Sequence, residues 1–309
     1  AIPSHTMCVV SLPREMRFIT KKDINLPERG KSSRKGDNGL VLAVGGSKDF
    51  VGAITLAGLA ALRSGCDLVK IIAPEKAAWA INAYSPDLMT KKMGGDYVNS
   101  IYYEVIKKEM EKYDVLLIGN GIGLNKQSKN FCIKIIREIK KFKVIDADAI
   151  KSISMDGCEN SIITPHSKEL EYFLLNSKIN KSVINKINTE KDITKKAQLI
   201  KRIAQKFLDN NNIILLKGKI DVIISRDRIF YVKGGNPGMT KGGTGDVLAG
   251  LCAGFLAQSN DVLQSSINAS YFNKKIGDIL LKKKKGFTYL ASDMVEEITQ
   301  IRREFHENF

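Results

Sequence analysis

Short apolar runs alternate with longer segments of helical period along most of the chain. The β-branched runs 68–73 and 213–216 predict buried strands, and the small-residue segment 52–64 predicts a closely packed helix. Alternation of this kind is typical of an α/β fold in which helices cover both faces of a mostly parallel sheet. Further strands are expected at 40–44, 115–118, 144–145, 162–163, 221–225 and 228–232, the last two as a hairpin.

The sequence shows no internal repeat and no second composition regime. Three helices are expected near 244–257, 260–283 and 291–304. Residues 1–17 form an expected N-terminal extension that could be the remnant of a fused upstream domain, and residues 18–309 are expected to form one catalytic domain. The polar segment 176–188, rich in Lys, Asn and Ile, is expected to be a surface excursion with only partial order.

Several expected strands are followed by a glycine or by a side chain that can bind a ligand or carry a proton. Glycines follow the strands at 40–44 and 115–118, Asp146 follows the next strand, Thr164-Pro165-His166 follows another, and Lys217 follows the strand at 213–216. In open α/β sheets this carboxyl edge is where ligands bind. Taken singly, Lys217 also fits as a strand boundary and His166 as a plain loop residue. Asp148 suits a metal and a helix N-cap equally well.

The most informative segment is the glycine-rich run at 242–246, Gly-Gly-Thr-Gly-Asp, which leads into an apolar helix. A helix start offers unpaired N–H groups and the positive end of the helix dipole to an anion. Asp246 stands out there, because a carboxylate repels a phosphate unless it has a task such as accepting a proton from a hydroxyl. The plainer interpretation is an ordinary helix start with Asp246 as a first-turn charge.

Composition narrows the possible functions. Hydrophobic residues make up 43% of the chain and the net charge is +16, which favours anionic partners. Nine Lys and Arg lie between 178 and 206, but without interleaved aromatics, so a nucleic-acid-binding protein is the weaker hypothesis. Five widely spaced cysteines and three histidines argue against a zinc site and favour a reducing cytoplasm. No apolar stretch approaches a membrane span.

Together these motifs resemble the ADP-dependent NAD(P)H-hydrate dehydratase family of the ribokinase-like superfamily. The resemblance runs from about Pro27 to about Asp293. The Gly-Gly-Thr-Gly-Asp element alone is shared with vitamin and sugar kinases, and the whole set is specific to the dehydratases. It comprises Lys35-Gly36-Asp37, Val44-Gly45-Gly46-Ser47, Gly52-Ala53, 61–65, 146–149, Thr164-Pro165-His166, Leu216-Lys217-Gly218 and Asn236-Pro237-Gly238-Met239.

The resemblance implies a three-layer ribokinase-like sandwich with two half-sites. The residues expected to contact the hydrated dinucleotide are Ala53, Gly121, Gly123, His166 and Asp246. The residues expected to contact the adenine nucleotide are Lys217, Gly218, Lys219, Ile220, Asp221, Gly243, Thr244 and Gly245. Asn120 departs from the family, whose G-P-G-x-G loop usually carries proline there, and this should change loop stiffness more than chemistry. Ser167-Lys168 and Leu170 also depart, and the loop after His166 is expected to differ.

The implied reaction is dehydration of the S epimer of hydrated NADH or NADPH, with ADP as phosphoryl donor, Mg²⁺ as cofactor, and AMP and phosphate as products. Asp246 would be the catalytic base. The alternative is a ribokinase-like kinase that phosphorylates a small vitamin-type alcohol and stops there. The expected partners are the two substrates, an NAD(P)H-hydrate epimerase and further copies of the chain, with neither nucleic acid nor membrane.

Overall fold

The computed structural model describes residues 16–284 and 286–305. Most of the expected N-terminal extension, residues 1–15, therefore lies outside the described residues. In the described part, nine strands form one sheet in the order β3-β2-β1-β4-β5-β6-β7-β8-β9. The strands are β1 (Leu40–Val44), β2 (Leu68–Pro74), β3 (Met89–Met93), β4 (Val115–Ile118), β5 (Phe142–Ile145), β6 (Ser161–Ile163), β7 (Ile213–Leu216), β8 (Asp221–Ile224) and β9 (Ile229–Val232).

Strands β1 to β7 run parallel to one another, and β8 and β9 extend the sheet as an antiparallel hairpin. Residues 17–19, well before β1 in the sequence, lie along β9, where Tyr231 donates its N–H to the carbonyl of Arg17 at 3.0 Å and accepts from the N–H of Ile19 at 2.8 Å. Arg17, expected in the extension, is therefore already held by the sheet.

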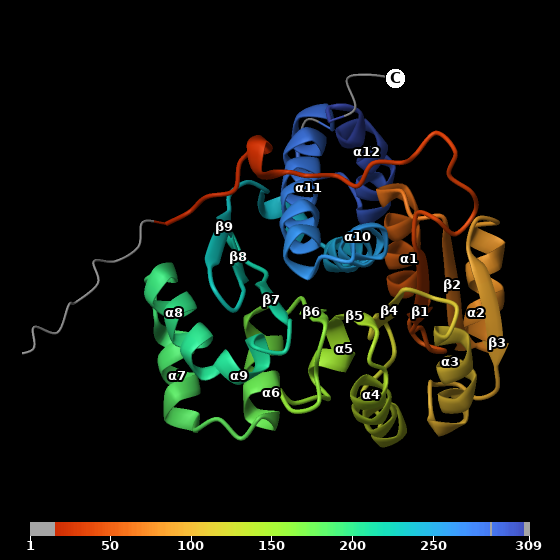
Figure 1. Cartoon of the computed structure of the whole chain (residues 1–309), viewed down its shortest axis with the longest axis horizontal. Coiled ribbons are helices and arrows are strands. Elements are labelled where there is room, and N and C mark those ends of the chain that lie inside the picture. The colour runs from red at the N-terminus through yellow and green to blue at the C-terminus, as the bar shows by residue number, and fades with distance from the viewer. Residues whose placement is uncertain (1–15, 285, 306–309) are drawn as a thin grey trace, which may run out of the picture.

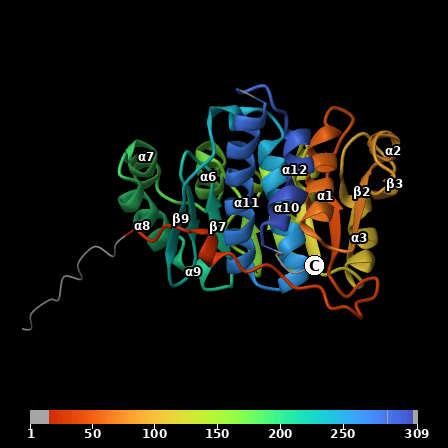
Figure 2. The same cartoon turned by 90° about the horizontal axis from the view of Figure 1, so that it is seen from above.

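One face of the sheet is covered by a layer that includes the C-terminal helices (Figures 1 and 2). This layer holds α1 (Gly52–Ser64), α2 (Glu75–Tyr84), α10 (Thr244–Ser259), α11 (Val262–Lys283) and α12 (Ala291–Arg303). Helix α10 is buried along most of its length. A Cβ atom at Gly250 would lie 2.1 Å from the carbonyl oxygen of Ala57, so the glycine lets α10 pack directly on the backbone of α1.

The opposite face carries the second helical layer (Figure 1). It holds α3 (Tyr103–Met110), α4 (Lys126–Glu138), α5 (Ala147–Ile150), α6 (Ser167–Asn176), α7 (Lys181–Thr189), α8 (Ile193–Ile203) and α9 (Gln205–Leu208). The expectation of partial order at 176–188 is wrong, because α7 is a regular helix. Ile184 and Ile187 are both buried in the core at helical spacing, a signal hidden by the polar residues around them.

The remaining sequence expectations agree closely with the structure. The helix at 52–64 and the strands at 40–44, 115–118 and 213–216 have the expected bounds, and the three C-terminal helices lie where they were expected. Strand β3 was missed because it is a half-exposed edge strand with the sequence Met-Thr-Lys-Lys-Met, which has no apolar run. Cys66, Cys132, Cys158 and Cys252 are buried free thiols.

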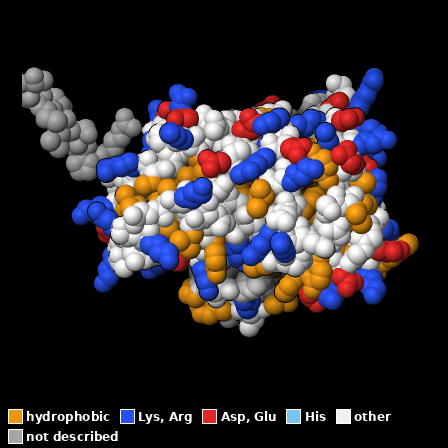
Figure 3. Space-filling view, turned by 90° about the horizontal axis from the view of Figure 1, so that it is seen from below, with side chains coloured by type: hydrophobic (Ala, Val, Ile, Leu, Met, Phe, Trp, Pro, Cys, Tyr) orange, Lys and Arg blue, Asp and Glu red, His pale blue; other side chains and the backbone are white. Residues whose placement is uncertain are grey.

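Across the described residues, no helix is both long and apolar enough to cross a membrane. The face that carries the second helical layer shows Lys and Arg side chains dispersed among uncharged ones rather than gathered in one block (Figure 3). In α7 and α8, Lys181, Lys186, Lys195 and Arg202 are exposed, as is typical of solvated helix faces.

Candidate active site

The carboxyl ends of β1, β4, β5, β6 and β7 meet at one edge of the sheet. Two glycine loops pack against each other there. Gly46 donates its N–H to the carbonyl of Asn120 at 2.9 Å, and a Cβ atom at Gly45 would lie 2.4 Å from the same oxygen. The glycine after β1 is therefore required for this close approach, which brings the loop after β4 beside the start of α10.

The glycine-rich run forms the start of α10, as expected. Gly243 is the N-cap with φ of +95°, and a Cβ atom there would lie 2.7 Å from Leu56. The Thr244 hydroxyl donates to the carbonyl of Met239 at 2.7 Å, which folds the preceding loop onto the helix. Helix geometry leaves the first backbone N–H groups without helical acceptors, so that anion binding at this helix start stays a prediction.

The Asn-Pro-Gly sequence before this loop has a structural role. The side-chain oxygen of Asn236 accepts from the N–H of Gly238 at 3.0 Å and from the Tyr289 hydroxyl at 2.8 Å, while its amide nitrogen donates to the carbonyl of Gly277 at 2.8 Å. A Cβ atom at Gly238 would lie 2.8 Å from the Tyr289 ring. The motif thus anchors the loop between α11 and the segment that precedes α12.

Lys217 projects from the end of β7 into a cluster of carboxylates. Its Nζ lies 3.0 Å from Asp146 Oδ1 and 3.5 Å from Glu169 Oε2. Burial disfavours the charged amine, but Asp146 and Glu169 outweigh burial and raise the pKa of Lys217 above its usual value. A Cβ atom at Gly245 would lie 3.4 Å from Nζ, so the ammonium sits directly beside the first turn of α10.

Asp246 lies in that first turn with its side chain partly buried. Burial, and then the negative charge of Asp146, raise the pKa of Asp246 to about 6, against a hydrogen bond from Asn120 and the charge of Lys217. Asn120 Nδ2 donates to Asp246 Oδ1 at 2.7 Å. A carboxylate with a pKa near neutrality is well matched to accepting a proton from a hydroxyl.

Asp146 organises the centre of the cluster. It accepts from Lys217, from the Thr164 hydroxyl at 2.7 Å and from Asn120 at 2.9 Å, and it occupies the N-cap position of α5. The N-cap role considered for Asp148 is therefore wrong. Asp148 instead accepts from the N–H of Gly123 at 3.1 Å and pairs with a lysine side chain. Both carboxylates are engaged by donors of the protein itself.

His166 is the N-cap of α6. Its Nδ1 accepts from the N–H groups of Lys168 at 3.1 Å and Glu169 at 3.4 Å, which places the proton of the neutral ring on Nε2, 3.4 Å from Glu169 Oε1. Burial lowers the pKa of His166, and Lys217 acts in the same direction against Glu169. Glu169 thus links the imidazole to Lys217, and the two residues expected in different half-sites border the same cleft.

That cleft has a volume of about 780 Å³ and opens between β7, the loop before α10, and α11. Of the residues expected to contact the nucleotide, Lys217, Gly218, Lys219, Asp221, Thr244 and Gly245 line it. Gly243 packs against Leu56 and Ala291 instead, and Ile220 packs against the second helical layer. The wall is held by Lys274, whose Nζ pairs with Asp221 at 3.1 Å, while Asp221 accepts from the Gly218 N–H at 3.0 Å.

Three of the residues expected to contact the dinucleotide do not line the cleft: Ala53, Gly121 and Gly123. A Cβ atom at Gly121, which has φ of +68°, would lie 3.5 Å from Ala53 Cβ and 2.9 Å from the carbonyl of Phe50. A Cβ atom at Gly123 would lie 3.3 Å from the Tyr97 ring. Ala53, Gly121 and Gly123 are thus brought together, and their contacts with a ligand stay predictions.

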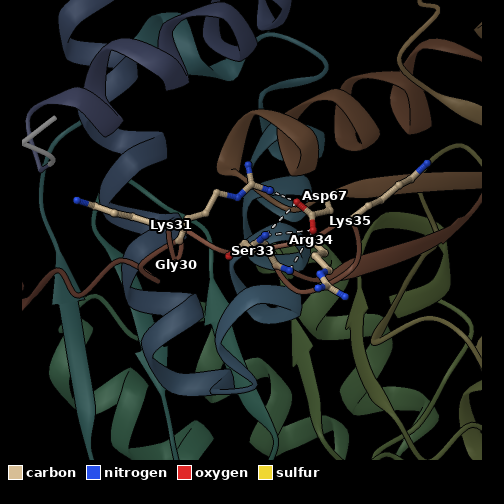
Figure 4. Close-up of a pocket in the computed structure, with 8 residues that line it drawn as sticks. Gly30, Lys31, Ser33, Arg34, Lys35 and Asp67 are labelled. Atoms are coloured by element: carbon tan, nitrogen blue, oxygen red, sulfur yellow. Dashed lines mark hydrogen bonds and ion pairs between the residues drawn. The ribbon is translucent and has the colours of Figure 1, made fainter.

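A basic pocket of about 440 Å³ lies at the opposite, amino-terminal edge of the sheet (Figure 4). At its centre, Asp67 accepts from the N–H of Gly36 at 2.8 Å and pairs with Arg29. Asp37 accepts from the N–H of Arg34 at 2.7 Å. The Lys35-Gly36-Asp37 motif therefore shapes a loop far from the cleft and contributes no group to it.

A solved structure with the same fold shows the class of protein to which the chain belongs. A ribokinase-like superfamily protein from Enterococcus faecalis superposes with a TM-score of 0.77 at 26% identity, over 94% of this chain and 96% of that one. The fold and the glycine-rich helix start thus define a ribokinase-like α/β protein. Residues 41–300 match the model of the NAD(P)H-hydrate dehydratase family, and the chain belongs to that family.

Individual relatives agree with this assignment. The bifunctional NAD(P)H-hydrate repair enzyme of Methanocaldococcus jannaschii is 36% identical over 96% of this chain and 55% of its own length. The ADP-dependent (S)-NAD(P)H-hydrate dehydratase of Cenarchaeum symbiosum is 31% identical over 94% and 98%. The Bacillus subtilis ADP/ATP-dependent NAD(P)H-hydrate dehydratase, co-crystallised with ATP/Mg²⁺, superposes with a TM-score of 0.76 at 25% identity over 94% and 99%. The chain spans about half the length of the bifunctional relatives.

Sequence reasoning missed three residues that complete the cluster: Asn120, Glu169 and Lys274. Asn120 was assigned only to loop stiffness, yet its side chain contacts Asp246. Glu169, a buried acid three residues after His166, carried the signal of a capping box, which the structure confirms. Lys274 lies in the middle of α11 and has no local signal, because its partner Asp221 is distant in sequence.

Proposed function

We propose that the chain is an ADP-dependent dehydratase that restores NADH or NADPH from the S epimer of the hydrated cofactor. The observation that carries the proposal is the position of Asp246, a partly buried carboxylate in the first turn of α10 with a pKa of about 6. Asp246 follows Gly245, which lines the cleft with Lys217, and it accepts a hydrogen bond from Asn120, which precedes Gly121. The names of the Cenarchaeum symbiosum and Bacillus subtilis relatives support the same substrates.

In this proposal the hydroxyl of the hydrated pyridine ring attacks the terminal phosphorus of ADP. Asp246 accepts the hydroxyl proton, the new O–P bond forms, and AMP leaves. Lys217 and the backbone N–H groups at the start of α10 stabilise the charge on the transferring phosphoryl group. The lone pair of the ring nitrogen then expels phosphate as the C–O bond breaks, and loss of a proton from the adjacent carbon restores the dihydropyridine.

Mg²⁺ would enter this site on the nucleotide. The described residues contain no group of three His, Cys, Asp or Glu side chains that could hold a metal by themselves. Asp146, Glu169 and Asp246 face the Lys217 ammonium, and three further lysines line the cleft: Lys219, Lys241 and Lys274. The co-crystallisation of the Bacillus subtilis relative with ATP/Mg²⁺ supports a nucleotide that carries the metal on its phosphates.

The test is an assay of the purified chain with hydrated NADH and Mg²⁺, comparing ADP, ATP and no nucleotide. We expect the reduced nicotinamide absorbance to return only with nucleotide, with one AMP and one phosphate released per turnover when ADP is the donor. A stable phosphate ester without return of that absorbance would favour the kinase alternative. Asp246→Asn is the matched control, because it keeps the shape of the side chain and removes the proton acceptor.

A further inference from the structure

Asn120 lies between two glycines in the loop after β4 and is fully buried. Its main-chain carbonyl is held by the N–H of Gly46. Its side chain is held separately, because Nδ2 donates both to Asp246 Oδ1 at 2.7 Å and to Asp146 Oδ2 at 2.9 Å. The loop position and the side-chain contacts therefore have independent anchors, and the side chain can be changed without removing the main-chain anchor.

The orientation of the Asn120 amide is fixed by its partners. Both are carboxylates that only accept hydrogen bonds when ionised, so the nitrogen must face them. The amide oxygen is then buried, and it has no hydrogen-bond partner among the described residues. An unpaired buried carbonyl destabilises a fold. The amide is therefore oriented by the two carboxylates, and this orientation leaves its oxygen without a hydrogen bond.

We infer that Asn120 is a positioning residue for the base of the reaction, and that its amide fixes the Asp246 carboxylate and stabilises its ionised form. This inference rests on the proposed function of Asp246. The proline usual at this place in the resembling G-P-G-x-G loops has no side-chain donor, so the device belongs to this chain rather than to the motif.

The other charged groups that face Asp246 come from three elements. Asp146 at the end of β5 and Glu169 in α6 disfavour its ionised form, while Lys217 at the end of β7 favours it. Asn120 is the only neutral donor among these contacts. Without its amide, one of two favourable interactions is lost, while burial and the two like charges still disfavour the ionised form of Asp246. The carboxylate should then take up its proton at a higher pH, and the base should be lost earlier as the pH falls.

The experiment compares the wild-type chain with Asn120→Ala and Asn120→Pro by two measurements. The first is the pH profile of kcat/KM for hydrated NADH. The second is the ¹³C NMR titration of the Asp246 carboxyl in the free protein, which needs no turnover. We expect the pKa of the acid limb and the pKa of the Asp246 carboxyl to rise together by about one unit. This is the size typical of losing one hydrogen bond to a carboxylate. At pH values below the pKa of Asp246, activity should fall about tenfold more than at pH values above it.

Thr164→Val is the matched control, because it removes a buried donor to Asp146 and leaves the contact with Asp246 intact. It should move the Asp246 titration less than either Asn120 variant does. Thermal unfolding checks the fold, and the proline variant carries the test if the alanine variant fails to fold. An unmoved titration with an equal loss of activity at every pH would overturn the inference. A moved titration in a chain whose wild type does not dehydrate the substrate would overturn the proposed function instead.

Discussion

Lys217 and Lys274 each hold a buried aspartate at nearly the same distance, 3.0 Å to Asp146 and 3.1 Å to Asp221. Both lysines line the same cleft. They differ in their remaining contacts. Lys274 donates to the backbone carbonyls of Gly218 and Lys219, and Asp221 accepts from the Gly218 N–H and the Ser270 hydroxyl.

The pair at Lys274 is therefore closed, because its partners are backbone groups of the cleft wall and the buried Ser270 hydroxyl. The pair at Lys217 is open, since Lys217 also reaches Glu169 and acts on the charge of Asp246, while Asp146 shares Asn120 with Asp246. The distance within an ion pair thus does not distinguish a structural pair from a functional one. The second partners of each group make that distinction, and the following variants test it.

Asp246→Asn should give the largest effect, because it removes the proton acceptor at the open end of the Lys217 pair. Turnover should fall by roughly 10² or more, the range for loss of a general base. The affinity for ADP should change little, which calorimetric titration can measure. A variant with near wild-type turnover would remove Asp246 from the mechanism and leave the Lys217 pair without a functional partner.

Lys217→Ala should rank next. The loss of a charged donor to phosphate oxygens should lower kcat/KM for ADP by roughly 10 to 10², consistent with about 1.5–3 kcal/mol for such a hydrogen bond. The apparent KM for ADP should rise more than that for hydrated NADH. Steady-state kinetics with each substrate varied in turn would measure both values. A larger rise for hydrated NADH would mean that the two half-sites have been assigned wrongly.

Lys274→Met should act on stability rather than on chemistry. It leaves Asp221 as an uncompensated buried charge, which costs about 3–5 kcal/mol in comparable cases. The free energy of unfolding should fall accordingly, while kcat at saturating ADP stays within a few-fold of wild type. Denaturant unfolding and kinetics test this together. The double variant Lys274→Met/Asp221→Asn should regain part of the stability, and a large loss of kcat in either variant would erase the proposed contrast.

His166→Ala should give the smallest kinetic change, a few-fold rise in the apparent KM for hydrated NADH. It also removes the N-cap of α6, which should lower stability by about 1 kcal/mol. His166→Asn is the control, because asparagine keeps the cap without the imidazole. If both variants change the KM for ADP instead, the link through Glu169 makes His166 part of the nucleotide side.

The sequence by itself determined most of the framework. Buried strands such as 115–118 and 213–216 are short apolar runs. The start of α10 is marked by glycines, and at Gly243 a side chain would collide with Leu56. Parallel strands place their carboxyl ends at one edge, so Asp146 and Lys217 could be expected to lie together. The hydrophobic pattern did not predict the helix α7 or the edge strand β3, because polar residues dominate both segments.

Only the tertiary structure decided what these residues do to one another. Asn120 and Asp246 are 126 positions apart, and Lys274 and Asp221 lie on different elements, so neither contact has a local sequence signal. Burial raises the pKa of Asp246 to about 6, and burial depends on the packing of α10 against the sheet. Sequence patterns specify elements through short-range periodicity, whereas charge, proton affinity and pairing at a site depend on neighbours that only the folded chain brings together.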